Sequence, residues 1–181
     1  MLTLILGGAR GGKSALAERL ALDAGGKVLY AATAEASDDE MRARIAAHRA
    51  QRPPAWRTCE EPRAVAAALA QAWQEAAPDF VLLDCVTVWV NNLLFAQGED
   101  HAAAARAVDG ELAALLAFMA AHPARWVLVS NEVGLGIVPD TPLTRLYRDL
   151  LGRANQQLAA AADKVILVVA GLPLTIKGRD E

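Results

Sequence analysis

The stretch Leu2-Thr3-Leu4-Ile5-Leu6-Gly7-Gly8-Ala9-Arg10-Gly11-Gly12-Lys13-Ser14 decides which fold this chain adopts. Residues 2–6 form an apolar run of strand length, and residues 7–14 match the phosphate-loop pattern G-x-x-x-x-G-K-[ST] at every required position. In such a loop the glycines let backbone amides face a phosphate, and the helix that follows offers its positive N-terminus. We therefore expect Lys13 to reach the β and γ phosphates and Ser14 to bind Mg²⁺. A chance glycine-rich turn is disfavoured by the strand before the loop and the helix after it.

Apolar runs of strand length alternate with Ala-rich stretches of helical periodicity along the whole chain. The expected strands span residues 2–6, 27–32, 57–60, 80–85, 126–131 and 165–170. The expected helices begin at Lys13, near Ser37 (with a Ser37/Glu40 capping box), after Pro62, after Cys85, near His101 and near Thr141, the last running to about Ala162. This alternation predicts an α/β fold with a largely parallel sheet flanked by helices. Without an internal repeat or a Pro/Gly/Ser-rich linker, residues 1–181 are expected to form a single domain.

Composition excludes several classes of protein. The 181 residues are 54% hydrophobic and 22% charged, which is typical of one compact domain that needs neither disulfides nor a structural metal. The 18 basic and 21 acidic residues give a net charge of -3 with no basic stripe, so we expect no nucleic-acid partner. Cys59 and Cys85 are isolated from each other and from histidines, which favours a cytoplasmic protein without a zinc site. The apolar start lacks the basic flank of a signal peptide, and no run is long enough to span a membrane.

Polar residues follow two of the expected strands. Asp84 ends the run Phe80-Val81-Leu82-Leu83, where a carboxylate could bind Mg²⁺ beside the phosphate loop. An ordinary strand-end turn residue is the alternative for Asp84. Asn131 and Glu132 come after the apolar run 126–129, at the end of the expected strand, and since ligands sit at the carboxyl ends of parallel strands, both are expected to face the same crevice as the loop. A polar turn that binds nothing is the alternative for this pair.

One histidine is a candidate for chemistry. Met41, Ile45, His48 and Arg52 recur at helical spacing, so the imidazole of His48 has a basic residue one turn away. A lone histidine on a helix is more often structural, and that alternative stays open on the residues alone. His101 and His122 lie near helix ends and suggest no chemistry.

Several separated motifs together resemble one family, the bifunctional adenosylcobinamide kinase and adenosylcobinamide-phosphate guanylyltransferase family of cobalamin biosynthesis. The resemblance spans nearly the entire chain. It rests on the loop at 7–14, the segments Asp38-Asp39-Glu40-Met41, Arg44-Ile45, His48-Arg49, Arg52-Pro53 and Trp56-Arg57-Thr58-Cys59-Glu60, then Asp84-Cys85, Asn92-Leu93-Leu94, Asn131-Glu132-Val133-Gly134, Gly136-Ile137-Val138-Pro139, Arg148-Asp149 and Asn155-Gln156. Two positions depart from the usual pattern: Gly11 stands where Ser is usual, and Ala47 where some members carry a second histidine.

The resemblance implies a RecA-like P-loop fold, a homotrimer, a corrinoid substrate and the use of GTP, ATP and Mg²⁺. It implies that His48 is the residue that becomes guanylylated, with Lys13 as a further catalytic residue and Ser14 and Asp84 as metal ligands. The implied nucleotide contacts are Gly7, Gly8, Ala9, Arg10, Gly11, Gly12, Lys13, Ser14, Ala32, Thr33, Ala34, Arg49, Ala50, Gln51, Arg52, Glu60 and Asp84.

The activity that the resemblance and the motifs imply has two steps. The enzyme phosphorylates the aminopropanol hydroxyl of adenosylcobinamide and then attaches GMP, giving adenosylcobinamide-GDP. Phosphoryl transfer needs charge neutralisation, which Lys13, Mg²⁺ and Asp84 would supply. Guanylyl transfer can proceed through a covalent intermediate on a neutral imidazole. Two alternatives remain: a plain P-loop small-molecule kinase in which His48 is structural, and a nucleotide-dependent regulatory switch.

Overall fold

The computed structural model describes residues 1–36 and 38–179, apart from the side chains of Glu40, Arg44 and Gln51. Its strands are β1 (Leu2–Gly7), β2 (Val28–Ala32), β3 (Arg57–Glu60), β4 (Phe80–Asp84), β5 (Arg125–Val129), β6 (Lys164–Val169) and β7 (Leu172–Lys177). Its helices are α1 (Lys13–Ala24), α2 (Asp39–Gln51), α3 (Val65–Glu75), α4 (Val86–Phe95), α5 (His101–Ala121) and α6 (Pro142–Ala161). The predicted alternation of strands and helices is confirmed.

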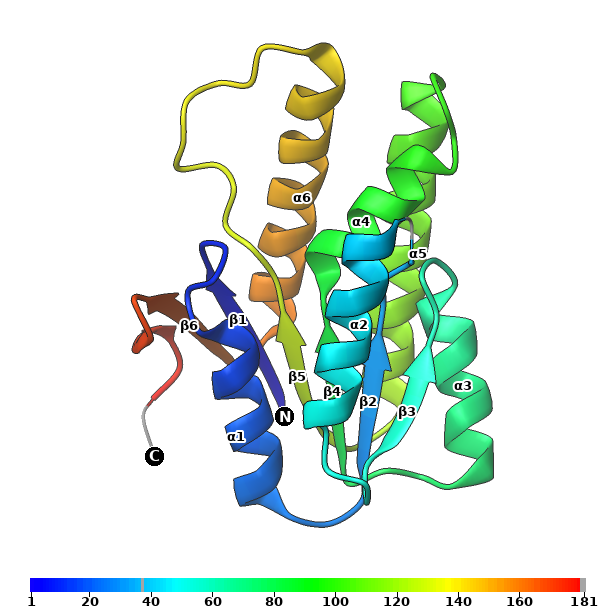
Figure 1. Ribbon diagram of the computed structural model, residues 1–181, viewed down its shortest axis with the longest axis vertical. Coiled ribbons are helices and arrows are strands. Elements are labelled where there is room, and N and C mark those ends of the chain that lie inside the picture. Colours follow the sequence, from blue (N-terminus) through cyan, green and yellow to red (C-terminus); the bar gives the residue numbers. More distant parts are fainter. Residues whose placement is uncertain (37, 180–181) are drawn as a thin grey trace.

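The strands of the described residues form one seven-stranded sheet in the order β3-β2-β4-β5-β1-β6-β7. Every pairing is parallel except that of β7 with β6, which is antiparallel. The carboxyl ends of the parallel strands therefore meet at one edge of the sheet, the upper edge in Figure 1. That edge carries the loops after β1, β2, β4 and β5, and with them the predicted site.

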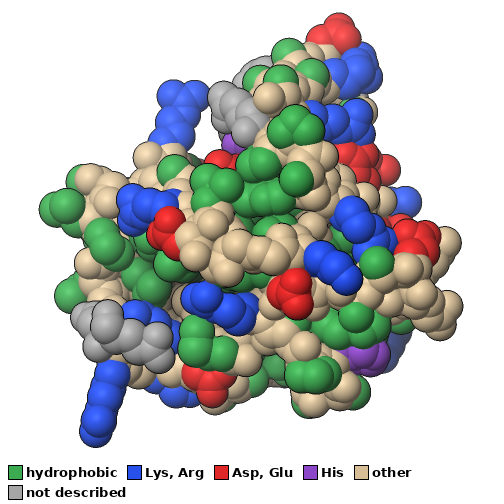
Figure 2. Space-filling model, turned by 90° about the horizontal axis from the view of Figure 1, so that it is seen from below, with side chains coloured by type: hydrophobic (Ala, Val, Ile, Leu, Met, Phe, Trp, Pro, Cys, Tyr) green, Lys and Arg blue, Asp and Glu red, His purple; other side chains and the backbone are tan. Residues whose placement is uncertain are grey.

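Helices cover both faces of the sheet, with α1 and α2 in front and the other four helices behind it in Figure 1. Side chains alternate along each strand: Leu4 packs into the layer behind the sheet, whereas the adjacent Ile5 packs into the layer in front. Burial on both faces explains why the strands read as continuous apolar runs. Across the described residues, no helix combines the length and apolar character needed to cross a membrane. Viewed from below, basic and acidic side chains are interspersed on the surface (Figure 2).

Helix α2 begins at Asp39, close to the predicted position. Its N-cap is Asp38, whose carboxylate accepts a 2.7 Å hydrogen bond from the backbone N–H of Met41. The predicted capping box of Ser37 and Glu40 lies outside the described residues. The cap fixes where the helix starts and therefore which residues of α2 turn toward the sheet edge.

Strand β7 is not among the strands expected from the sequence. It follows β6 through a tight turn in which Ala170 and Gly171 both have positive φ, 52° and 81°. The backbone N–H of Gly171 donates a 3.0 Å hydrogen bond to the carbonyl of Gly11. The β6–β7 turn is therefore hydrogen-bonded to the backbone of the phosphate loop.

Candidate active site

The phosphate loop leaves β1 along a path that only glycine can follow. A Cβ at Gly7 would lie 2.3 Å from the carbonyl oxygen of Val168 on β6, and Gly12, which precedes α1, has φ 95°. Helix α1 then begins at Lys13, with its N-terminus facing the loop. Sequence and backbone geometry thus agree on an anion-binding loop at this edge of the sheet.

Lys13 is the cation of this loop. Its Nζ donates a 2.7 Å hydrogen bond to the carbonyl of Gly8, and the residue is 7% exposed. Desolvation by burial lowers the pKa of Lys13, while the charges of Cys85 and Asp84 act in the opposite direction. A bound phosphate would replace the carbonyl as the partner of this ammonium group and supply the counter-charge that it lacks.

A cavity of about 420 Å³ opens beside the loop, between α1 and α2 and above the ends of the strands. It brings together ten of the residues predicted from sequence: Ala9, Arg10, Lys13, Ser14, Ala32, Ala34, His48, Arg52, Glu60 and Asp84. Asn131, the strand-end residue after β5, also lines it. A single cavity therefore contains the phosphate-loop cation, the helix histidine and the strand-end carboxylate.

The floor of the cavity contains a residue that sequence reasoning missed. Tyr30, on β2, is 2% exposed, and its hydroxyl donates a 2.8 Å hydrogen bond to Oδ2 of Asp84. Burial and the adjacent carboxylate raise the pKa of Tyr30, so its hydroxyl keeps its proton and remains a donor. No sequence signal marks Tyr30, because it reads as one more core residue of an apolar strand.

Two arginines lie beside Glu60: Arg52 lines the cavity, whereas Arg49 lies outside it. Arg49 Nε donates to Glu60 Oε1 at 2.6 Å, and its Nη2 donates to Oε2 of the same carboxylate. The guanidinium of Arg52 lies 3.9 Å from the centre of the Tyr30 ring, and its side chain is 8% exposed. Among the described atoms, Arg52 Nε and Nη1 have no hydrogen-bond partner. These buried donors at the cavity wall can bind an anion.

Other predicted site residues lie outside this cavity. Gly7, Gly8, Gly11 and Gly12 form the backbone of the phosphate loop without lining the cavity, and Arg49 and Ala50 are exposed on the outer side of α2. The side chain of Gln51 lies outside the described residues.

Thr33 is fully buried. Its hydroxyl donates a 2.8 Å hydrogen bond to the carbonyl of Cys85 and accepts a 3.0 Å hydrogen bond from the backbone N–H of Cys85. Thr33 thus holds the backbone after Asp84 and has no free hydroxyl for a ligand.

Cys85 contributes its backbone and not a nucleophile. Burial raises the pKa of its thiol to about 11, and the sulfur accepts a hydrogen bond from the N–H of Val88 at the start of α4. A thiol with such a pKa is almost entirely protonated at neutral pH. A protonated, buried thiol fits the interpretation of Cys85 from the sequence as a small apolar residue.

The side chains of the two strand-end residues after β5, Asn131 and Glu132, lie on different sides of the chain. Asn131 lines the cavity, and its backbone N–H donates to the hydroxyl of Thr87 at 2.6 Å. Glu132 instead lines a separate hollow along α6. Its carboxylate accepts a 2.6 Å hydrogen bond from the backbone N–H of Gly134 in the same loop. The expectation that both would face the crevice is therefore wrong for Glu132, because successive residues of an extended chain point to opposite sides.

Sequence comparison matches this chain to one family over almost its whole length. The family described as "Cobinamide kinase / cobinamide phosphate guanyltransferase" matches residues 3–176. A relative from Pseudomonas aeruginosa, the bifunctional adenosylcobalamin biosynthesis protein CobP, is 49% identical over 178 residues, covering 98% of each chain. CobU of Salmonella typhimurium, with the same descriptive name, is 49% identical over 185 residues, covering 98% of this chain and 100% of that protein.

Solved structures show the same fold at low sequence identity. An ATPase from a type III secretion system aligns with TM-score 0.60 and 14% identity, covering 96% of this chain and 56% of the ATPase. The RadB recombinase aligns with TM-score 0.53 and 16% identity, covering 92% of this chain and 73% of RadB. The predicted RecA-like P-loop architecture is confirmed by these alignments.

Proposed function

The chain belongs to the cobinamide kinase / cobinamide phosphate guanyltransferase family of enzymes, and on this basis we propose that it catalyses two reactions. In the first, adenosylcobinamide is phosphorylated on its aminopropanol hydroxyl by ATP or GTP. In the second, GMP passes from GTP to adenosylcobinamide phosphate, giving adenosylcobinamide-GDP and pyrophosphate. The observation that carries the proposal is that Lys13 of the phosphate loop and His48 of α2 line the same cavity.

The kinase step depends on groups that bind and neutralise phosphates. Lys13 and the amides of the loop bind the β and γ phosphates, and Arg10 at the cavity rim adds a second positive charge. The hydroxyl of Ser14 and the carboxylate of Asp84 fit Mg²⁺, which needs few protein ligands because phosphate and water oxygens supply the rest. When bound, Mg²⁺ neutralises charge on the transferring phosphoryl group. Tyr30 keeps Asp84 oriented toward the cavity by its hydrogen bond.

The guanylyl step is a double displacement at the α phosphate of GTP. A ring nitrogen of neutral His48 forms a bond to the α phosphorus. At the same time the bond between the α phosphorus and the oxygen that bridges to the β phosphate breaks, and pyrophosphate leaves. The other ring nitrogen loses its proton to solvent. A phosphate oxygen of adenosylcobinamide phosphate then attacks the same phosphorus, and the imidazole leaves and regains a proton. The guanidinium of Arg52, which lies four residues after His48 and whose Nη1 is 3.9 Å from Oε1 of Glu60, stabilises the charge on the α phosphate in both displacements.

The remaining features of the proposal concern organisation. We propose that residues 1–181 act as a single domain, which is supported by the single seven-stranded sheet that the strands of the described residues form. A cytoplasmic setting is supported by two cysteines that are both free thiols. We also propose a homotrimer, which the family resemblance implies, and exposed apolar side chains on the loop between β5 and α6, where Leu135 and Ile137 are 85% and 97% exposed, offer a surface for subunit contact. Sedimentation equilibrium of the purified chain tests that assembly.

Two radioactive labels on the nucleotide distinguish the two reactions. Adenosylcobinamide incubated with the enzyme, Mg²⁺ and γ-labelled ATP or GTP should yield labelled adenosylcobinamide phosphate. The enzyme incubated with Mg²⁺ and α-labelled GTP, without a corrinoid, should gain about one GMP per chain, and later addition of adenosylcobinamide phosphate should release it as adenosylcobinamide-GDP. Phosphorylation without a GMP adduct would identify a plain small-molecule kinase. Nucleotide hydrolysis without either corrinoid product would favour a regulatory switch.

A further inference from the structure

The carboxamide of Asn131 lines the nucleotide cavity, yet the two proposed reactions assign it no role. The residue is half-buried, and within the part of the chain that the structure describes its carboxamide forms no hydrogen bond. Two other asparagines use their carboxamides inside the fold. Asn92 Nδ2 donates to two backbone carbonyls at 2.8 and 3.0 Å, and Asn155 Oδ1 accepts from the hydroxyl of Ser130 at 2.7 Å. The carboxamide of Asn131 is therefore available to a ligand in the cavity.

The register of the sheet places Asn131 between two groups proposed to bind the terminal phosphates. Strand β5 lies between β4 and β1. Val129, two residues before Asn131, pairs with Asp84 at the end of β4 and with Ile5 on β1. The phosphate loop with Lys13 follows β1 directly. Asn131 therefore extends from the strand between the carboxylate proposed to bind Mg²⁺ and the loop that carries the lysine, and all three side chains line one cavity.

Four hydrogen bonds hold the backbone at Asn131. Its N–H donates to the hydroxyl of Thr87 on α4 at 2.6 Å, and its carbonyl accepts from Nδ2 of Asn155 on α6 at 3.0 Å. The N–H groups of the residues before and after it donate to carbonyls of β1 at 2.9 and 3.1 Å. Partners on three elements thus fix this backbone relative to the phosphate loop. A donor on a backbone held in this way needs little reorganisation when charge moves on a bound phosphate.

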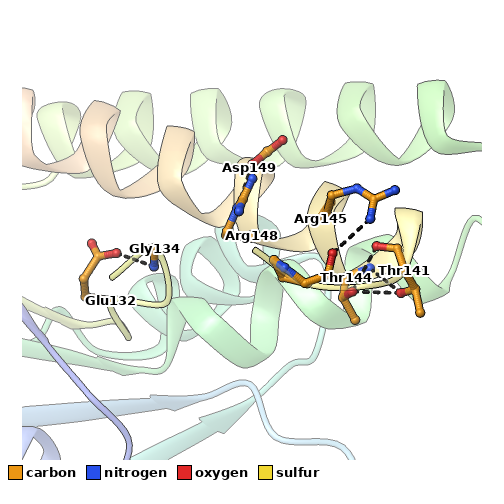
Figure 3. Close-up of polar contacts among 8 residues, drawn as sticks. Glu132, Gly134, Thr141, Thr144, Arg145, Arg148 and Asp149 are labelled. Atoms are coloured by element: carbon orange, nitrogen blue, oxygen red, sulfur yellow. Dashed lines mark hydrogen bonds and ion pairs between the residues drawn. The ribbon is translucent and has the colours of Figure 1, made fainter. Parts of the chain in front are cut away.

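The residue after Asn131 does not compete for this position. The carboxylate of Glu132 accepts a 2.6 Å hydrogen bond from the backbone N–H of Gly134 and lies against its own loop (Figure 3). Of the described residues 130–141, only Asn131 lines the nucleotide cavity. The loop after β5 therefore presents a neutral amide to the cavity and keeps its carboxylate, which would repel a triphosphate, outside it.

The order of the strands separates Asn131 from the group proposed to act at the α phosphate. Arg52 lies beside Glu60, which ends β3, and two strands lie between β3 and β5. Neighbouring strands are about 4.8 Å apart, so three spacings separate the ends of β3 and β5 by about 14 Å. The phosphate loop lies beyond β5 at the end of β1. Asn131 therefore lies toward the terminal phosphates that the loop binds.

We propose that Asn131 is a catalytic residue of the kinase step, in which its Nδ2 donates a hydrogen bond to an oxygen of the γ phosphoryl group. This assignment rests on the proposed function, because it takes phosphoryl transfer as one of the reactions. In that transfer the hydroxyl oxygen of the acceptor forms a bond to the γ phosphorus, and the bond from this phosphorus to the bridging oxygen breaks. The nucleoside diphosphate leaves, and the hydroxyl proton passes to solvent. The amide binds the moving group and neither gains nor loses a proton.

Binding of a triphosphate and of a diphosphate tests the contact without a corrinoid. Asn131→Leu keeps the approximate volume of the side chain and removes its donors. In the presence of Mg²⁺, Kd for the β,γ-imido analogue of GTP should rise about tenfold, and Kd for GDP should stay at the wild-type value, because only the analogue carries a γ phosphoryl group. Isothermal titration calorimetry measures both constants. Asn131→Ala, which adds no volume, should show the same selective loss and separates it from a packing defect of the leucine.

Asn91→Leu is the matched control. Asn91 on α4 is also half-buried, but it does not line the cavity, so both of its Kd values should match those of wild type. An unchanged Kd for the analogue in both Asn131 variants would overturn the assignment. An equal loss of affinity for GDP and for the analogue would do the same, as would an equal loss in the control.

Kinase rates test whether the contact acts in the transition state. Asn131→Leu should lower kcat for phosphorylation of adenosylcobinamide about 100-fold, as loss of one preorganised donor does, and leave KM for adenosylcobinamide unchanged. Its GMP label from saturating α-labelled GTP should match wild type, because the α phosphorus lies elsewhere. A change confined to KM for adenosylcobinamide would place Asn131 at the acceptor and overturn the assignment. If wild type phosphorylates no adenosylcobinamide, the proposed function fails, whereas the two Kd values still decide whether Asn131 contacts the γ phosphoryl group.

Discussion

The hydroxyl of Tyr30 donates a 2.8 Å hydrogen bond to Oδ2 of Asp84, so a buried residue of β2 orients the carboxylate at the end of β4. The ring of the same tyrosine lies under the guanidinium of Arg52 at 3.9 Å and stacks on Trp56 with ring centres 6.4 Å apart. Tyr30 therefore contacts the group proposed to bind Mg²⁺ and the group proposed to stabilise the α phosphate. One aromatic side chain therefore contacts both of these proposed groups.

Tyr30→Phe should keep the stacking and remove the hydrogen bond. We expect a loss of about 1–3 kcal/mol in the free energy of unfolding, because a hydrogen bond to a charged group is lost. The Mg²⁺ concentration that gives half-maximal kinase rate should also rise, since Asp84 is no longer oriented. Urea denaturation and an Mg²⁺ titration measure the two effects. Tyr147→Phe is the control, because its hydroxyl donates only to a neutral carbonyl, that of Thr87, at 3.2 Å. Equal Mg²⁺ dependence in the two variants would contradict this role for Tyr30.

Lys13→Met should stabilise the nucleotide-free protein while weakening triphosphate binding. Burial lowers the pKa of Lys13 below its ordinary value of 10.5, so folding opposes the charged form. Below the lowered pKa the charged lysine therefore decreases stability, and this penalty disappears as the pH rises to 10.5. The melting temperature of Lys13→Met should exceed that of wild type at neutral pH, and the difference should shrink in alkaline buffer. A melting temperature below that of wild type at neutral pH would show that the hydrogen bond to Gly8 outweighs desolvation.

The edge of the sheet that carries the site could be predicted, because the sequence features that specify this edge are local. The apolar run at 2–6, the glycines after it and the carboxylate at Asp84 each specify a strand, a turn or a strand end without reference to the rest of the chain. Parallel strands then bring these ends together, which is why Lys13 and Asp84 line one cavity.

The features that sequence reasoning missed depend on orientation or on distant contacts. Tyr30 looks like a core residue until its hydroxyl is seen to reach Asp84 on the neighbouring strand. Glu132 has the same local sequence context as Asn131, but the direction of its side chain follows from the path of the chain after β5. Strand β7 was missed because its turn is Ala-Gly and not Asn-Gly, and because Pro173 suggests a loop. Proline is tolerated there because β7 is an edge strand.

Arg52→Lys should raise KM for GTP about tenfold while leaving the fold intact. Lysine keeps the positive charge, but it has no planar group to stack on Tyr30 and no pair of N–H donors for a phosphate. Steady-state kinetics with GTP measure the change, and circular dichroism checks the fold. Arg42→Lys on α2 is the control, because Arg42 is exposed and its ion pair within the described residues is with Asp39, so the KM of this variant should match that of wild type. An equal KM in both variants would remove Arg52 from the nucleotide site.

Asp84→Asn should reduce the Mg²⁺-dependent kinase rate much more than it reduces stability. The amide keeps the shape of the side chain and can still accept from the hydroxyl of Tyr30, but it has lost the charge that attracts the metal. Kinase rates across an Mg²⁺ titration, together with the melting temperature, separate the two effects. If the variant melted at a lower temperature with an unchanged Mg²⁺ dependence, Asp84 would be a structural strand-end residue.

His48→Ala should abolish the GMP adduct and leave the kinase step largely unchanged. The covalent bond requires a nucleophilic nitrogen, whereas phosphoryl transfer depends on Lys13, Ser14 and Asp84 across the same cavity. His48 is exposed on α2, so its truncation removes little packing and the variant should fold. In wild type the adduct from α-labelled GTP should be labile in acid and stable in alkali, as a phosphoramidate is, and peptide mapping should place it on His48.

His101→Ala is the control. This variant lacks another exposed histidine, which lies outside the cavity, and it should gain the GMP label as wild type does. Full labelling of His48→Ala, or an adduct mapped to another residue, would refute the covalent role and leave the chemistry of guanylyl transfer to a different nucleophile.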